Sequence, residues 1–273
     1  MKKKINLRLA LLVLALSLSA ITLATAKILR HKSAAAQNPA SVTKPNRNVY
    51  VRRAQLSPRL VMNLNALGNR LEKAGQERLA LVGTWRVAGT AQPREFAATL
   101  EFPDRLRLTV AGPQNRVITF DGQQTNGTAD DLDLIETLAY DSAEHFFAAQ
   151  MQGNAMRFLG ARFRTDDGSS PDYDGPYFDI YKIADQIKAS GEERAAKLYY
   201  FNSDTLLLER VTYDINRGGS EISVETKLSD WRLVEDQQVA RRIERFENGK
   251  SVFALTIRLA SLGRRADDGI FAQ

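Results

Sequence analysis

Runs of alternating apolar and polar residues restrict the fold of this chain more than any other feature. The clearest run places apolar side chains at every second position, at Phe96, Ala98, Leu100 and Phe102. A period of two puts successive side chains on opposite faces of a strand, so each run predicts one apolar and one polar face. The same spacing recurs at Leu106, Leu108 and Val110 and at Phe253, Leu255, Ile257 and Leu259. Such strands are typical of an antiparallel sheet that is covered on one side.

Turn sequences separate about ten such strands along the chain. Asn202-Ser203-Asp204 and Gly218-Gly219 stand between two runs, and Asn248-Gly249 predicts a type I′ hairpin between residues 239 and 259. A parallel sheet would need a crossover after nearly every strand, and the sequence offers too few helices for that. The predicted fold class is therefore mainly β (α+β): a curved antiparallel sheet or a partly closed barrel, with helices over its apolar concave face.

Two helices are predicted. Ser57 followed by Pro58 is a helix start, and an apolar stripe continues to a predicted end near Gly75. Thr128 and Asp131 have the spacing of a capping box and open a second helix that continues to about Met151. The stripe of the first helix is Leu60, Val61, Leu64, Leu67 and Leu71, and that of the second is Leu134, Ile135, Leu138, Phe146 and Ala149.

The N-terminal segment has the layout of a secretory signal peptide. Lys2, Lys3, Lys4 and Arg8 precede an uncharged stretch over residues 9–26, and Ala24-Thr25-Ala26 and Ala34-Ala35-Ala36 are small-residue cleavage sites. An uncleaved anchor is the alternative, because 18 helical residues span roughly 27 Å. We therefore expect residues 1–36 to be a signal peptide or membrane anchor, 37–56 a disordered linker and 57–273 one β domain. On both interpretations the chain is exported to the periplasm, with anchoring to the inner membrane through residues 9–26 left open.

Charge and cysteine content exclude several classes of function. The formal net charge is +6, but seven basic residues and no acid lie in residues 1–36, so the remainder carries −1. Without a basic excess the domain lacks the electrostatic footprint of a nucleic-acid-binding protein. The absence of cysteine excludes disulfides, thiol nucleophiles, thiolate metal sites and attachment through a lipid-modified cysteine.

No catalytic residue or cofactor is predicted. The domain contains one histidine, His145, and none of the common nucleophile, phosphate-loop, dinucleotide or zinc motifs. An acidic loop at Asp166, Asp167, Asp172 and Asp174 fails the spacing of a calcium loop, because the twelfth position is Tyr177. The sequence therefore predicts a non-enzymatic protein without a metal or cofactor.

Several short segments resemble the LolA/LolB-like periplasmic proteins. They are Asn202-Ser203-Asp204-Thr205-Leu206-Leu207-Leu208-Glu209-Arg210, Leu228-Ser229-Asp230-Trp231-Arg232-Leu233-Val234 and Ala266-Asp267-Asp268-Gly269-Ile270-Phe271. The resemblance spans roughly residues 58–273. It implies an incomplete antiparallel barrel with a helical lid around a hydrophobic cavity.

The resemblance also implies a function. Its relatives bind lipoprotein acyl chains or other lipids, or sense the state of the envelope through partner proteins. We expect an envelope carrier that binds a lipid or a lipoprotein acyl chain, and an envelope-sensing or scaffold protein with a protein partner is the alternative. The expected cavity wall, which has the same pattern as a filled core, is Trp85, Phe96, Leu100, Phe102, Leu106 and Leu108. The expected lid residues are Leu134, Leu138, Phe146 and Phe147.

Overall fold

The computed structural model describes residues 56–68, 77–90, 92–102, 105–112, 115–122, 124–151, 156–163, 177–183, 196–264 and 269–271. All described residues belong to one compact unit, Asn48–Gln273. The predicted leader, the predicted linker up to Gln55 and the acidic loop lie outside the described residues. No helix in the described ranges is long and apolar enough to cross a membrane.

Eleven antiparallel strands form one sheet in the described part of the chain, where the sequence predicts about ten. Its spatial order is β4-β3-β2-β1-β11-β10-β9-β8-β7-β6-β5. The first strand, β1, therefore pairs with the last strand, β11. The strands are β1 (Arg78–Val87), β2 (Arg94–Glu101), β3 (Arg105–Val110), β4 (Arg116–Phe120), β5 (Met156–Phe163), β6 (Tyr177–Ile183), β7 (Lys197–Asn202), β8 (Leu208–Arg217), β9 (Ser220–Val234), β10 (Gln237–Glu247) and β11 (Lys250–Gly263).

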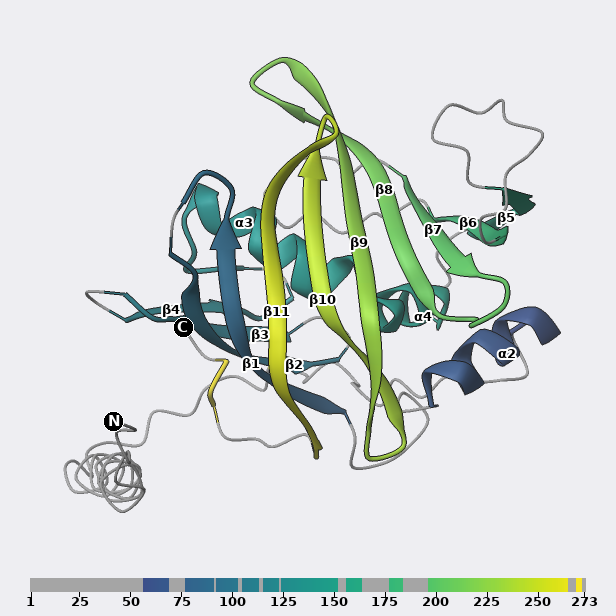
Figure 1. The fold of residues 1–273 in the computed structure, drawn as a ribbon, viewed down its shortest axis with the longest axis horizontal. Coiled ribbons are helices and arrows are strands. Elements are labelled where there is room, and N and C mark those ends of the chain that lie inside the picture. The colour runs from purple at the N-terminus through teal and green to yellow at the C-terminus, as the bar shows by residue number, and fades with distance from the viewer. Residues whose placement is uncertain are drawn as a thin grey trace, which may run out of the picture. The chain divides into compact units, whose positions relative to one another are not determined.

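The sheet curves but does not close. Strands β4 and β5 are its two edges, and no pairing joins them among the described residues. Figure 1 shows helices α3 and α4 behind β8–β11, on the concave side of the sheet. The predicted open antiparallel barrel with a helical covering is therefore confirmed.

Helix α2 (Pro58–Leu67) begins where the sequence predicts. Ser57 is the N-cap, and its Oγ accepts a hydrogen bond from the backbone N–H of Leu60 at 3.4 Å. The helix ends earlier than the predicted Gly75, because Gly68 takes a left-handed conformation with φ of 102° and its N–H donates to the carbonyl of Asn65. The predicted stripe residue Leu71 lies outside the described residues.

The second helical segment is three pieces and not the single helix that was predicted. They are α3 (Ala129–Ile135), the π-helix η3 (Glu136–Tyr140) and α4 (Ala143–Met151). The capping box is confirmed, since the N–H of Thr128 donates to Oδ2 of Asp131 at 2.8 Å. The break follows from the wide π turn, in which the N–H of Asp141 donates to the carbonyl of Glu136 at 3.0 Å.

Two further sequence predictions can be compared with the strands. The hairpin at Asn248-Gly249 is confirmed, because both residues have positive φ, 47° and 74°, as a type I′ turn requires. Strand β5 was missed, because Gly160 has φ of 102° at a register shift and interrupts the alternation of an edge strand.

Ile270 and Phe271, from the last segment that resembles the LolA/LolB-like proteins, pack on the outer face of the sheet. Phe271 is buried, and the guanidinium groups of Arg78 and Arg105 lie 5.7 and 5.4 Å from its ring centre. Arg107 donates from Nη1 to the carbonyl of Ile270 at 2.8 Å. The turn therefore fixes the end of the chain to strands β1 and β3.

Candidate ligand-binding site

The predicted wall residues lie together on the concave face of β1–β3. Leu100 of β2 pairs with Leu79 of β1 on one side and with Leu106 of β3 on the other, and the next inner pair is Ala98 with Leu108. All six predicted wall side chains are buried in one hydrophobic cluster, at 8% exposure or less: Trp85, Phe96, Leu100, Phe102, Leu106 and Leu108. The predicted set is thus one contiguous surface.

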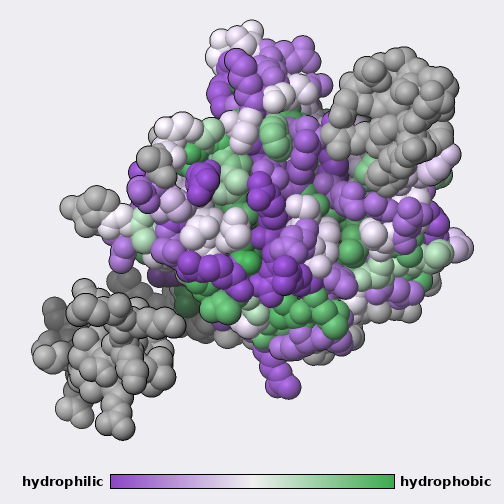
Figure 2. Space-filling model, in the orientation of Figure 1, coloured by the Kyte–Doolittle hydropathy of each residue, from purple (hydrophilic) through white to green (hydrophobic). Residues whose placement is uncertain are grey.

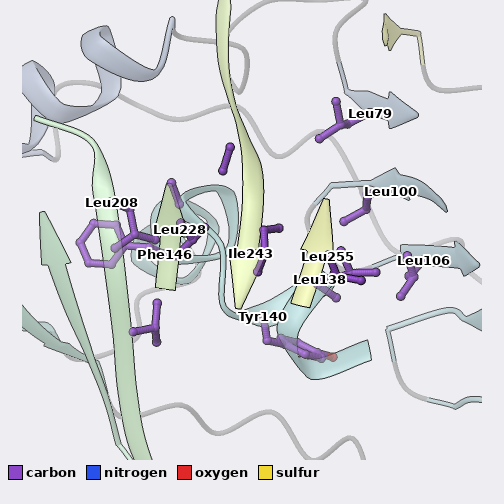
Figure 3. Close-up of a cluster of buried hydrophobic side chains, with 14 of the residues drawn as sticks. Leu79, Leu100, Leu106, Leu138, Tyr140, Phe146, Leu208, Leu228, Ile243 and Leu255 are labelled. Carbon is purple, nitrogen blue, oxygen red and sulfur yellow. The ribbon is translucent and has the colours of Figure 1, made fainter. Parts of the chain in front are cut away.

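The predicted lid residues belong to the same cluster. Leu134 lies on α3, Leu138 on η3, and Phe146 and Phe147 on α4, and none is more than 3% exposed. Figure 3 shows Leu138 and Phe146 of this covering among buried side chains from both halves of the sheet. In this structure the predicted lid and the predicted wall therefore share one apolar core.

An aromatic group that the sequence prediction missed surrounds Phe146. Its ring centre lies 4.9 Å from that of Phe201, 5.0 Å from that of Tyr199 and 5.5 Å from that of Tyr181. These partners come from β6 and β7, at the opposite end of the sheet from the predicted wall. Edge-to-face aromatic pairs add about 0.5–1.5 kcal/mol each beyond the burial of their area. They hold α4 against the sheet.

Charged residues hold η3 to strand β7. Lys197 is completely buried, and its Nζ donates to Oδ1 of Asp141 at 2.6 Å and also to Glu136. The other oxygen of Asp141 accepts from Oγ1 of Thr226 at 2.6 Å and from the hydroxyl of Tyr213 at 3.2 Å. Asp141 is itself fully buried, so the structure compensates its charge through three sheet residues on β7, β8 and β9.

A second ionic group holds α3 to strand β10. Arg245 is 1% exposed, and its Nη2 donates to Asp133 of α3 at 3.0 Å and to Glu247 at 3.1 Å. Its Nη1 donates to the hydroxyl of Tyr213 at 3.0 Å, which connects this group to Asp141. The two groups therefore form one network between the lid and four strands of the sheet.

Burial and neighbouring charge shift the pKa values within this network. Burial raises the pKa of Asp133, although Arg245 and Arg217 act in the opposite direction. Burial, together with the charges of Asp141 and Glu136, raises the pKa of Tyr213 well above its usual value, so its hydroxyl stays protonated and can donate to Asp141. Burial lowers the pKa of Arg245, but the surrounding negative charges more than offset this and raise it.

The remaining chemical candidates lie inside the same core. His145 is 2% exposed on α4, and its ring lies 4.8 Å from that of Tyr140 in an edge-to-face contact. Within the described ranges, no three His, Asp or Glu side chains are grouped so that they could hold a metal ion. The arrangement is that of two apolar surfaces in contact, with the ionic network at one side.

The ionic network has a signal in the sequence, but the alternation of apolar and polar residues alone does not reveal it. Lys197 is in phase with Tyr199 and Phe201, which are both 1% exposed, and Arg245 is in phase with Ile243. A charged residue at an inward position of a strand must find a buried partner. The partners Asp133 and Asp141 lie on a distant helical segment, so the pairing itself could not be read from the strands.

Comparisons with known proteins identify the fold. No protein-family model matches the chain, and no curated protein matches it. A LolA superfamily protein from Nitrosomonas europaea has a similar structure, with a TM-score of 0.52 and 10% identity over 78% of this chain and 97% of that one.

Two further solved structures match at lower similarity. A putative outer membrane lipoprotein-sorting protein domain from Vibrio parahaemolyticus has a TM-score of 0.46 and 8% identity over 77% of this chain and 95% of that one. A DUF1329 family protein from Desulfovibrio piger has a TM-score of 0.47 and 8% identity over 80% of this chain and 98% of that one. With the open eleven-stranded sheet and its helical covering, the similarity to the Nitrosomonas protein shows that this chain has a LolA-like fold.

Proposed function

We propose that this chain is an exported, non-catalytic protein that binds a lipid or a lipoprotein acyl chain between its helical lid and the concave face of β1–β3, as an envelope carrier. The observation that carries the proposal is the contact between two apolar surfaces, the predicted wall and the predicted lid, within one buried cluster. The LolA-like fold supports the same interpretation.

The energetics of this contact fit an exchange of the lid for a ligand. Burying an acyl chain contributes about 0.8 kcal/mol per methylene, so about ten buried methylenes contribute roughly 8 kcal/mol. A chain inserted between the lid and the wall would cover both apolar surfaces, which are now buried in one cluster. The ionic network must open or shift for this insertion, and it would close the lid again after the ligand leaves.

Export is the second part of the proposal. The basic and then apolar N-terminal segment supports residues 1–36 as a signal peptide, with an anchor through residues 9–26 as the other form of the same export. A cleaved chain would be free to carry a ligand across the periplasm. An anchored chain would present its domain at the inner membrane, on the linker 37–56.

Native mass spectrometry and lipid extraction of the exported protein, purified without detergent, test the binding proposal. We expect co-purifying lipid in stoichiometric amount, or uptake of added fatty acid at one to two molecules per chain, on the order expected for a single small site. A protein that carries no lipid and takes up none, while its sheet is folded by circular dichroism, would contradict the proposal.

A protein partner is the alternative function, and one feature of the outer face favours it. Val82 of β1 pairs with Leu259 of β11, and the same cross-strand row continues to Val117 of β4. These three side chains are 37%, 67% and 39% exposed. Figure 2, drawn from the side of β8–β11, shows apolar residues gathered on the lower half of this mostly hydrophilic face.

Glutamate at position 259 separates the two functions. If the outer row binds a protein, Leu259→Glu removes a defined cross-linked product in envelope extracts and leaves fatty-acid uptake unchanged. If the lid interface is the functional surface, Leu259→Glu changes neither the cross-linked products nor fatty-acid uptake. A charge on the inner wall then abolishes uptake.

A further inference from the structure

Arg241 lies on the concave face of β10, where the neighbouring inward positions are apolar. Val239 and Ile243, two residues to either side, are 3% and 7% exposed, and Arg245 follows on the same face at 1%. Arg242 points the other way and is exposed. The alternation of the strand therefore directs the Arg241 side chain into the sheet's interior side.

The guanidinium of Arg241 is partly buried and has no partner among the described residues. Its Nε and Nη1 atoms are inaccessible to solvent, and Arg241 forms no hydrogen bond or ion pair with any of the described residues. The flanking pairs, Arg242 with Ser229 and Ala240 with Trp231, place Asp230 opposite. The carboxylate of Asp230 is bound instead to Arg232, at 3.0 Å from its Nε.

The other arginines of the same strand are paired, which makes the isolation of Arg241 distinctive. Arg245 bonds to Asp133, Glu247 and Tyr213, and Arg242 bonds to Glu244 through Nε and Nη2, both at 2.8 Å. A guanidinium keeps its charge at any physiological pH and offers a planar fork of donors. A partly buried charge without a counter-ion carries a desolvation cost, so this position favours an anion from outside the chain.

We propose that Arg241 binds the anionic group, a carboxylate or a phosphate, of the ligand whose acyl chain lies between the lid and the wall. The inference rests on the proposed function and specifies its ligand class as an anionic lipid. Two parallel N–H···O bonds from Nε and one Nη are the usual way in which arginine binds either group.

The register of the sheet connects this position to the predicted wall. Since Arg242 pairs with Thr256, Arg241 is beside Ile257, which pairs with Gly83, which in turn pairs with the wall residue Phe96. Three strand spacings separate Arg241 from Phe96, about 14 Å at 4.8 Å per strand. A headgroup at Arg241 thus places its acyl chain along an inner row that leads to the wall.

A second unpaired donor lies on the same face. Trp85 is 8% exposed, its Nε1 atom is buried, and it has no hydrogen-bond partner among the described residues. Its row, Trp85 with Leu255 and Leu255 with Ile243, is the one next to that of Arg241. Oxygen atoms of a ligand at this end of the concave face would therefore meet two donors.

Three ligands of equal acyl length test the proposal: palmitate, palmitoyl lysophosphatidylglycerol and the neutral monopalmitoylglycerol. The wild-type chain should bind at least one anionic ligand about 10- to 100-fold more tightly than the neutral one, the ratio expected for a charge-assisted fork. A larger gain in affinity for palmitate indicates a carboxylate headgroup, and a larger gain for palmitoyl lysophosphatidylglycerol indicates a phosphate. Arg241→Met should lose this preference and keep its affinity for the neutral ligand.

Arg242→Met is the matched control, because Arg242 is the adjacent arginine and its guanidinium is already occupied by Glu244. It should leave the preference unchanged. An Arg241→Met variant that retains the preference overturns the inference while the proposed function stands. If the wild-type chain binds none of the three ligands, the proposed function is overturned instead, and the inference with it.

Thermal unfolding of the ligand-free protein supplies a readout that is independent of binding. Removal of an uncompensated, partly buried charge should raise the unfolding midpoint of Arg241→Met by about 2–4 °C. A lowered midpoint together with an unchanged ligand preference would assign Arg241 a purely structural role and contradict the proposal.

Discussion

Lys197 and Asp141 form a fully buried ion pair, with Nζ 2.6 Å from Oδ1, between strand β7 and the end of the π-helix η3. Neither side chain reaches solvent, so each depends on the other and on Glu136, Thr226 and Tyr213 for compensation. The lid is consequently held in place by groups that are stable only while it is closed.

Replacement of Lys197 should destabilise the protein strongly. Lys197→Met leaves the carboxylate of Asp141 buried without its cation, and we expect the free energy of unfolding to fall by about 3–5 kcal/mol. Urea denaturation followed by circular dichroism measures this loss. Adding Asp141→Asn to the variant should recover part of it, because the uncompensated charge is then removed.

An exposed ion pair provides the comparison for this experiment. Arg242→Met breaks the contact with Glu244 on the outer face and should cost less than about 1 kcal/mol. Equal losses in the Lys197 and Arg242 variants would show that the buried network does not hold the lid.

Tyr181 predicts a dependence of stability on alkaline pH. Burial, followed by the charge of Asp179, raises its pKa to about 12. Since the folded-state pKa exceeds the unfolded value of about 10, its contribution is complete below pH 10 and is lost as the pH rises towards 12. Tyr181→Phe should therefore flatten the decline of the unfolding free energy between about pH 10 and about pH 12, the window set by the two pKa values.

The ring contacts of Tyr181 make phenylalanine the suitable replacement. Its ring lies 5.5 Å from Phe146 and 5.8 Å from Phe201, and Phe retains both contacts. An alkaline decline that is as steep in the variant as in the wild type would mean that Tyr181 does not contribute.

A charge on the inner wall should abolish ligand uptake. Leu100 is 4% exposed between Leu79 and Leu106, and Leu100→Asp places a carboxylate where the acyl chain is proposed to lie. Phe102→Asp is the second variant of the same wall. Uptake of a fluorescent fatty acid, measured only on variants with wild-type circular dichroism, reports the effect, and unchanged uptake would reject these residues as the wall.

Leu100→Ala should cost about 2–5 kcal/mol of stability, as other deletions of buried leucine side chains do. It reduces the wall without charging it, so it separates loss of stability from loss of binding. We expect the alanine variant, once folded, to retain weaker uptake where the aspartate variant retains none.

The sequence predicts the sheet well because each strand carries its own information. Leu100, Leu106 and Leu108 show their common face through a period of two, and Asn248-Gly249 specifies its turn through backbone conformation. The interruption of the second helix was not predicted, since apolar residues at helical spacing continue across Tyr140 and Asp141. Asp141, at the end of this π turn, pairs with Lys197, which lies 56 positions further along the chain.

One part of the candidate site could likewise be predicted from the sequence, and the other part could not. Its apolar part, the wall and lid residues, follows from periodicity, because an inward apolar position needs no particular partner. Its polar part does not, because Lys197 and Arg245 each bind an acid from a segment more than 50 positions away in the chain. The isolation of Arg241 is visible only once the partners of its neighbours are known.

Photolabelling tests the central claim most directly, that the ligand lies between the lid and the concave face. A fatty acid with a diazirine near the end of its chain is bound to the exported protein, activated by light and located by peptide mapping. We predict labels on β2 and β3 (Arg94–Val110) and on the helical segment Ala129–Met151. Labels confined to the outer row of Val82, Leu259 and Val117 would contradict the account.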